Sequence, residues 1–120
     1  MSNLAEFQSP FAAFLGIKVT HVSLDRVEAE LEVRKELATI PDILHGGAVM
    51  ALADNLGGVA TVANLPQGAR TATIESKTNF FSAIPVGETA RAECTPLHRG
   101  RATMVWQTRI PGTMAASARW

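Results

Sequence analysis

Asp54 is the only formally charged side chain between Asp42 and Arg70, within the apolar stretch ILHGGAVMALADNLGGVATVANLPQGA. An ordinary surface helix spreads several Lys, Glu or Arg over its wet face. A lone carboxylate in such a segment therefore lies in a buried interface or does chemistry. If it does chemistry, a carboxylate can accept a proton or attack a carbonyl carbon.

His45-Gly46-Gly47 stands just upstream, where the long helix is expected to begin. Free backbone N–H groups at a helix start carry partial positive charge, and glycines let an oxygen approach them closely. This sequence is therefore a candidate oxyanion site. The alternative is a tight entry turn, with His45 serving only to satisfy a nearby carbonyl.

The spacing of these two features limits how they can cooperate. Asp54 follows Gly46 by eight residues, about 12 Å along a helix, which is too far for both to reach one carbonyl. Two such helices lying antiparallel across a dimer axis bring Asp54 of one subunit to Gly46 of the other. A symmetric dimer then holds two composite sites.

The side of the helix that carries Asp54 is otherwise small, flexible or weakly polar. It holds Gly47, Met50, Ala51, Gly57, Gly58 and Thr61. Glycine costs a helix about 1 kcal/mol relative to Ala, so a strip of this kind indicates that a ligand or another backbone approaches there. The alternative is plain packing against a neighbouring helix, with Asp54 capped by a hydroxyl.

The surrounding pattern predicts an α+β fold with a mostly antiparallel sheet around one long helix. The helix runs from about Gly46 to Ala63 and ends at the breakers of residues 64–68. Its bulky face should pack into the sheet and consists of Val49, Leu52, Leu56, Val59 and Ala63. Strands are expected at Ile17–Val22, Arg26–Arg34, Thr71–Phe81, Glu88–Leu97, Ala102–Ile110 and Thr113–Arg119.

A short helix is also predicted near the start of the chain. Ser9 suits the N-cap, Pro10 the first turn and Gly16 the position beyond the end. This helix should lay Phe11, Phe14 and Leu15 on the core.

Composition restricts the class of protein. A length of 120 residues predicts one domain, residues 1–120. The 11 Lys and Arg balance the 11 Asp and Glu, so the chain has no net positive charge that would attract nucleic acid or an anionic membrane. A single Cys94 and the absence of a secretory signal favour the cytosol. Asp54 and His45 favour a buried core helix over a membrane span.

The sequence also resembles a known family. LHGGAVMALADNLGGVAT, TIESKTNFFSAIPVGE and the HRGR hairpin are similar to the hotdog-fold acyl-CoA thioesterases of the phenylacetate-degradation type. The resemblance implies a six-stranded hotdog sheet wrapped around the helix, dimers paired into tetramers, and hydrolysis of an acyl-CoA to free acid and CoA. It implies no metal and no cofactor besides the coenzyme A of the substrate.

Residue roles follow from this resemblance. Asp54 is implied as general base or nucleophile, the Gly46 N–H as the oxyanion donor, His45 as the group that orients the approach, and Thr73 as a holder of the attacking water. Gly47, Met50, Gly58 and Phe81 are candidate substrate contacts. Family members usually carry Asn or Gln six residues before the His, where this chain has Thr39, whose hydroxyl has a shorter reach.

Other candidates are weaker. Arg99 and Arg101 are interpreted either as phosphate contacts for CoA or as a solvated hairpin tip. Cys94 and His98 lie about 13 Å apart on a strand, too far for a nucleophile and its base, and His21, His45, His98 and Cys94 lack metal-ligand spacing. One of Phe80 and Phe81 should be core.

Three alternatives to a thioesterase remain. They are a non-catalytic acyl-CoA-binding module, a hotdog-fold enoyl-CoA hydratase, and an assembly subunit without a ligand.

Overall fold

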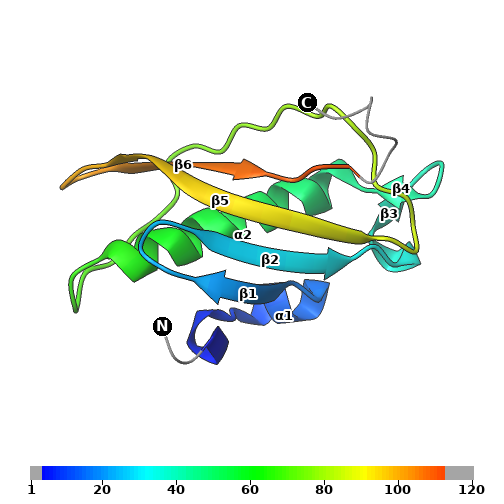
Figure 1. Ribbon diagram of the computed structural model, residues 1–120. Coiled ribbons are helices and arrows are strands. Elements are labelled where there is room, and N and C mark those ends of the chain that lie inside the picture. Colours follow the sequence, from blue (N-terminus) through cyan, green and yellow to red (C-terminus); the bar gives the residue numbers. More distant parts are fainter. Residues whose placement is uncertain (1–3, 113–120) are drawn as a thin grey trace.

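A computed structural model describes residues 4–112 and contains the predicted long helix against an antiparallel sheet (Figure 1). The elements in chain order are η1 (Leu4–Phe7), α1 (Pro10–Leu15), β1 (Lys18–Val22), β2 (Val27–Glu32), η2 (Lys35–Leu37), β3 (Ala38–Thr39), β4 (Ile43–Leu44), α2 (Gly46–Asn64), β5 (Thr89–Arg99) and β6 (Met104–Arg109). The fold class and the long helix are as predicted.

The main sheet has four antiparallel strands in the order β1-β2-β5-β6, and β3 and β4 form a separate pair. Alternating residues of the central strands face α2, and the register places Val27 opposite Cys94 and Leu31 opposite Ala90. Because β5 contributes mainly alanines to this face, the helix can approach the sheet closely.

Helix α2 packs against one face of the main sheet (Figure 1). Leu52, Leu56 and Val59 are buried there, and Val49 and Ala63 pack partly against the same core, as predicted. By length and composition alone α2 could cross a membrane. Its buried leucines instead make it the core helix of this domain.

Helix α1 is capped as the sequence predicts. The Ser9 side chain accepts the Ala12 N–H, and Gly16 takes the left-handed conformation that ends the helix. The prediction of its core face was right for Leu15 and wrong for Phe11 and Phe14. Ala12 and Leu15 are buried, whereas Phe11 is 62% exposed and Phe14 is 75% exposed, because the short helix meets the core along only one narrow stripe.

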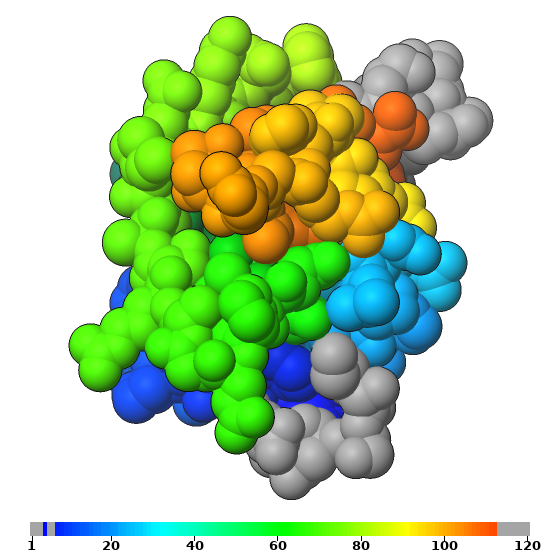
Figure 2. Space-filling view, turned by 90° about the vertical axis from the view of Figure 1, so that its left-hand side faces the viewer, coloured from blue at the N-terminus to red at the C-terminus, as the bar shows by residue number. Residues whose placement is uncertain are grey.

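The prediction of a strand at Thr71–Phe81 was also wrong. Thr71–Phe81 is extended but forms no ladder with any strand of residues 4–112. Figures 1 and 2 show this yellow-green segment along one side of the molecule, beside the β5–β6 hairpin and α2. A groove lies between this segment and β6, so the two do not form a ladder.

The predicted six strands are therefore not all present. The main sheet has four within the described residues. The predicted strand Thr113–Arg119 lies outside them.

Candidate active site

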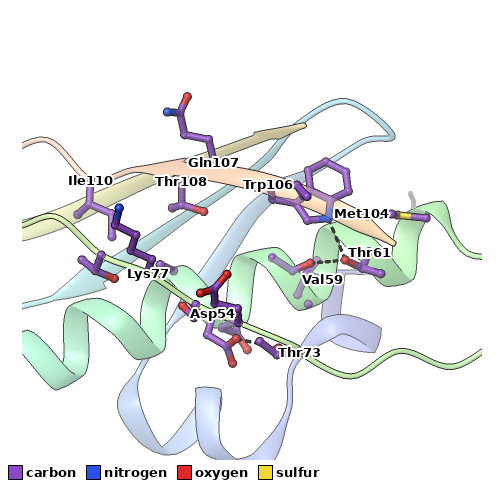
Figure 3. A pocket seen from close by; sticks show the side chains of 18 of the residues that line it. Asp54, Val59, Thr61, Thr73, Lys77, Met104, Trp106, Gln107, Thr108 and Ile110 are labelled. Atoms are coloured by element: carbon purple, nitrogen blue, oxygen red, sulfur yellow. Dashed lines mark hydrogen bonds between the residues drawn. The ribbon is translucent and has the colours of Figure 1, made fainter. Parts of the chain in front are cut away.

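A groove of about 1630 Å³ lies between α2, β6 and residues 70–84 (Figure 3). The inner face of β6 contributes every second residue, Met104, Trp106 and Thr108, which are half-buried, while the side chains between them are exposed. The helix contributes Asp54 and the small residues of the following turn. This volume exceeds that of a typical small-ligand pocket, so it has room for more than an acyl group.

Asp54 lies on α2 at the edge of this groove and is exposed. The Thr73 hydroxyl donates a hydrogen bond of 2.9 Å to Asp54 Oδ1 (Figure 3). The bond joins the 70–84 segment to the helix. It uses one oxygen and leaves the other to act on a ligand or a water molecule.

The start of α2 has one backbone N–H that the helix cap does not use. His45 is the N-cap, and its Nδ1 accepts the Gly47 N–H at 2.8 Å. Among residues 4–112 the Gly46 N–H has no acceptor. The helix therefore presents one free donor, at the residue the sequence indicated, and His45 fixes the turn that presents it.

Phe80 is a neighbour of Gly46 that the sequence analysis did not assign to the site. A Cβ built on Gly46 would lie 3.4 Å from the Phe80 ring. Phe80 is 56% exposed and Phe81 is 67% exposed, so the prediction that one of them is core was wrong. Residues 79–81 are all exposed, whereas Ile84 at the end of the segment is buried.

The structure gathers some of the other predicted residues and separates the rest. Thr39, Gly58, Phe81 and Arg101 line the groove with Asp54, Gly46 and Thr73. His45 and Gly47 line a smaller recess beneath α1 instead. Met50 is exposed on α2.

The two hairpin arginines have different surroundings. Arg99 donates to Leu24 O and to Asp25 Oδ1, both at 2.8 Å, so its guanidinium is engaged with the β1–β2 turn. Arg101 is exposed at the groove. Of the pair, Arg101 has the freer position for a phosphate.

Trp106 and Thr61 form a second feature that sequence reasoning did not assign to the site. Trp106 Nε1 donates to Thr61 Oγ1 at 2.9 Å, and Thr61 Oγ1 donates to Gly57 O at 2.8 Å. The sequence predicted a strand at Ala102–Ile110. It gave no indication that one face of this strand would meet the turn of α2 that follows Asp54.

Cys94 and His98 are not a catalytic pair in this structure. Cys94 is fully buried on β5 and His98 is exposed. Burial raises the pKa of the Cys94 thiol, and its hydrogen bond with Thr108 opposes this in part. A buried thiol with a raised pKa is a poor nucleophile.

Comparison with known proteins decides the family. The sequence profile described as Thioesterase superfamily matches residues 42–110, more than half of the chain. The chain belongs to this superfamily. The matched residues include the whole of α2, with both Gly46 and Asp54, so the candidate site lies within the thioesterase domain.

Individual relatives agree with this thioesterase assignment. The chain is 31% identical over 109 residues to the 1,4-dihydroxy-2-naphthoyl-CoA hydrolase of Escherichia coli, covering 88% of this chain and 79% of the relative. A thioesterase structure from Haemophilus influenzae aligns with TM-score 0.83 and 26% identity, over 91% of this chain and 76% of that one. The phenylacetic acid degradation protein PaaI of Thermus thermophilus shares the hotdog fold, with TM-score 0.78 and 24% identity over 85% of each chain. The chain is thus a thioester hydrolase of the hotdog fold.

Proposed function

We propose that the protein hydrolyses a small or medium acyl-CoA, including aromatic ones, to the free acid and CoA at a site made by two subunits. The observation that carries this proposal is the position of Asp54 and the unpaired Gly46 N–H on one continuous helix. Eight residues of helix separate them by about 12 Å. One reacting carbonyl can meet both only if a second copy of α2 supplies one of them.

The chemistry follows from these groups. Asp54 takes a proton from a water molecule as the water oxygen bonds to the thioester carbon, and negative charge develops on the carbonyl oxygen. The Gly46 N–H donates to that oxygen. The C–S bond then breaks, and the CoA sulfur leaves and is protonated. In the direct alternative, a carboxylate oxygen of Asp54 attacks first and water hydrolyses the resulting anhydride.

Supporting roles extend the same proposal. Thr73 orients Asp54 and keeps lone pairs free to accept a hydrogen bond from the attacking water. Arg101 contacts a CoA phosphate, and Arg99 stays with the β1–β2 turn. The reaction needs no metal or cofactor, because CoA enters with the substrate. A cytosolic dimer that pairs into a tetramer completes the assignment.

The first test replaces Asp54 by Asn, which keeps the shape and removes the base. We expect kcat/KM for a panel of aryl- and alkyl-CoA thioesters, followed by free thiol release, to fall at least about 100-fold. Glu88→Gln, an exposed carboxylate outside the groove, is the matched control and should be unchanged. Unaltered thioester cleavage in Asp54→Asn would remove Asp54 from the mechanism.

The second test deletes the oxyanion donor itself. Gly46 is the first residue of α2 and His45 before it is extended, so the backbone at this position accepts proline. Proline removes the N–H and adds a ring whose Cβ lies about 3.4 Å from the Phe80 ring, an ordinary van der Waals contact. We expect Gly46→Pro to keep its melting temperature and to lose about 100- to 1000-fold in kcat. His45 and the helix cap stay in place.

Mixing the two inactive variants tests whether the site is shared. Random dimers of Asp54→Asn with Gly46→Pro contain one intact composite site in every heterodimer, so about a quarter of wild-type activity should return. A site built within one chain would return none.

A non-catalytic acyl-CoA-binding protein is the second candidate, favoured by one observation. Thr39 lines the groove on β3 where an amide would give a longer reach toward the thioester. This candidate predicts that acyl-CoA raises the melting temperature while no thiol is released.

A further inference from the structure

Trp106 lies on the wall of the groove, above the half of α2 that follows Asp54 (Figure 3). It is half-buried on β6, between Met104 and Thr108 on the same inner face. Its only polar group, Nε1–H, is already used by Thr61 Oγ1 at 2.9 Å. The ring can therefore meet a ligand through its apolar surface without leaving a buried donor unpaired.

The hydroxyl that holds the indole is also committed. Thr61 Oγ1 donates to the Gly57 carbonyl at 2.8 Å, one turn back along the helix. The three residues form one chain of hydrogen bonds from β6 to the backbone of α2. This chain fixes the indole relative to the turn that carries Asp54, so the wall is preorganised.

Beside this wall the helix leaves open space. A Cβ added at Gly57, or at Gly58, would meet no heavy atom within 4 Å. Gly57 and Gly58 follow Asp54 by three and four residues, which places both on its side of the helix. The groove is thus lined by the Asp54 carboxylate, by the side-chain-free backbone of Gly57 and Gly58 next to it, and by the Trp106 indole on the β6 wall.

On the basis of the thioesterase function above, we propose that Trp106 is the residue that selects the acyl group, and that it favours a flat aromatic acyl group lying over Gly57. An aromatic ring gains from an indole through offset or edge-to-face contact beyond the area that it buries. A flexible alkyl chain gains only the buried area and loses rotamer freedom on binding. The selection acts on the acyl part, because the CoA part is common to all substrates.

The activity test compares benzoyl-CoA with hexanoyl-CoA in Trp106→Leu and Trp106→Phe. We expect Trp106→Leu to lower the benzoyl-to-hexanoyl ratio of kcat/KM about five- to tenfold, and Trp106→Phe to keep most of it. Gln107→Leu is the matched control, since the Gln107 side chain points away from α2 in Figure 3, and it should leave the ratio unchanged. Thr61→Val should lower the melting temperature with a smaller change in the ratio.

A binding test is independent of catalysis. The sequence has two tryptophans, so Trp120→Phe leaves Trp106 as the only indole. In that background the non-hydrolysable thioether S-benzyl-CoA should change the indole fluorescence and bind more tightly than S-hexyl-CoA. Trp106→Leu, followed by calorimetry, should remove the difference between the two thioethers.

The outcomes of these tests distinguish the role of Trp106 from the proposed thioesterase activity on which it rests. Equal losses for benzoyl- and hexanoyl-CoA in Trp106→Leu, or equal binding of the two thioethers, would overturn the role of Trp106 and leave the thioesterase intact. Absence of thioester cleavage in the wild type would overturn the function. Tighter binding of S-benzyl-CoA that depends on Trp106 would then still support an aromatic pocket.

Discussion

Thr73 and Asp54 are joined by a hydrogen bond of 2.9 Å that crosses from the extended 70–84 segment to the core helix. The bond links a side chain of that segment directly to a side chain of α2. The same contact that orients the proposed base therefore also anchors the segment that forms one wall of the groove.

Replacing Thr73 by Val tests that double role. A hydrogen bond to a charged group contributes about 1.5–3 kcal/mol, so kcat should fall about tenfold or more. Thr71→Val, an exposed threonine of the same segment, is the control and should stay near wild-type activity. Equal kinetics in the two variants would mean that Thr73 does not position Asp54.

Replacing Thr39 by Gln should raise activity. Thr39 is exposed on β3 and lines the groove, so a longer amide has room there and can donate toward the thioester oxygen. We expect kcat for the preferred acyl-CoA to rise about tenfold, the value of one added hydrogen bond in the transition state. A lower kcat at unchanged stability would show that the hydroxyl is the better group in this chain.

Arg34 is expected to be a major local determinant of stability. Its Nη1 donates to Leu15 O at 2.6 Å and its Nη2 donates to Phe14 O at 3.1 Å, which caps the carboxyl end of α1. Arg34→Met should lower the free energy of unfolding by about 2 kcal/mol, measured by urea denaturation. Arg26→Met, which breaks an exposed pair with Glu28, should cost under about 1 kcal/mol.

Cys94 should make stability fall at alkaline pH. Burial raises the pKa of the folded thiol, so its contribution to stability is complete below the unfolded pKa, near the ordinary value of 9.0, and is lost as pH rises through the folded value. Urea denaturation from pH 7 to 10.5 should therefore show a steeper decline in the wild type than in Cys94→Ala. Parallel declines would assign the alkaline loss to other groups.

The long helix and the central strands could be predicted because their signals are local. Leu52, Leu56 and Val59 repeat at the helical period, and residues 27–32 alternate strictly between apolar and charged. The cap of α1 followed from Ser9, Pro10 and Gly16 for the same reason.

The failures concern contacts with other parts of the chain. Residues 71–81 have strand-like composition, but a strand also needs a neighbour, and the groove beside β6 supplies none. Phe11 and Phe14 are apolar, yet a six-residue helix buries only one stripe. Trp106 was not assigned to the site because its contact with Thr61 depends on how β6 packs against α2.

The order of strands in the sheet sets a requirement on how the chain folds. The β1–β2 and β5–β6 hairpins join near neighbours along the chain. The central β2–β5 ladder instead pairs Glu30 with Arg91, which are separated by 61 positions in the sequence, and all of α2 lies between them. Closing so long a loop costs entropy before any ladder contact compensates for it. The two hairpins can form early and separately. The rate of folding then depends on how quickly both hairpins dock on the face of α2 that carries Leu52 and Leu56.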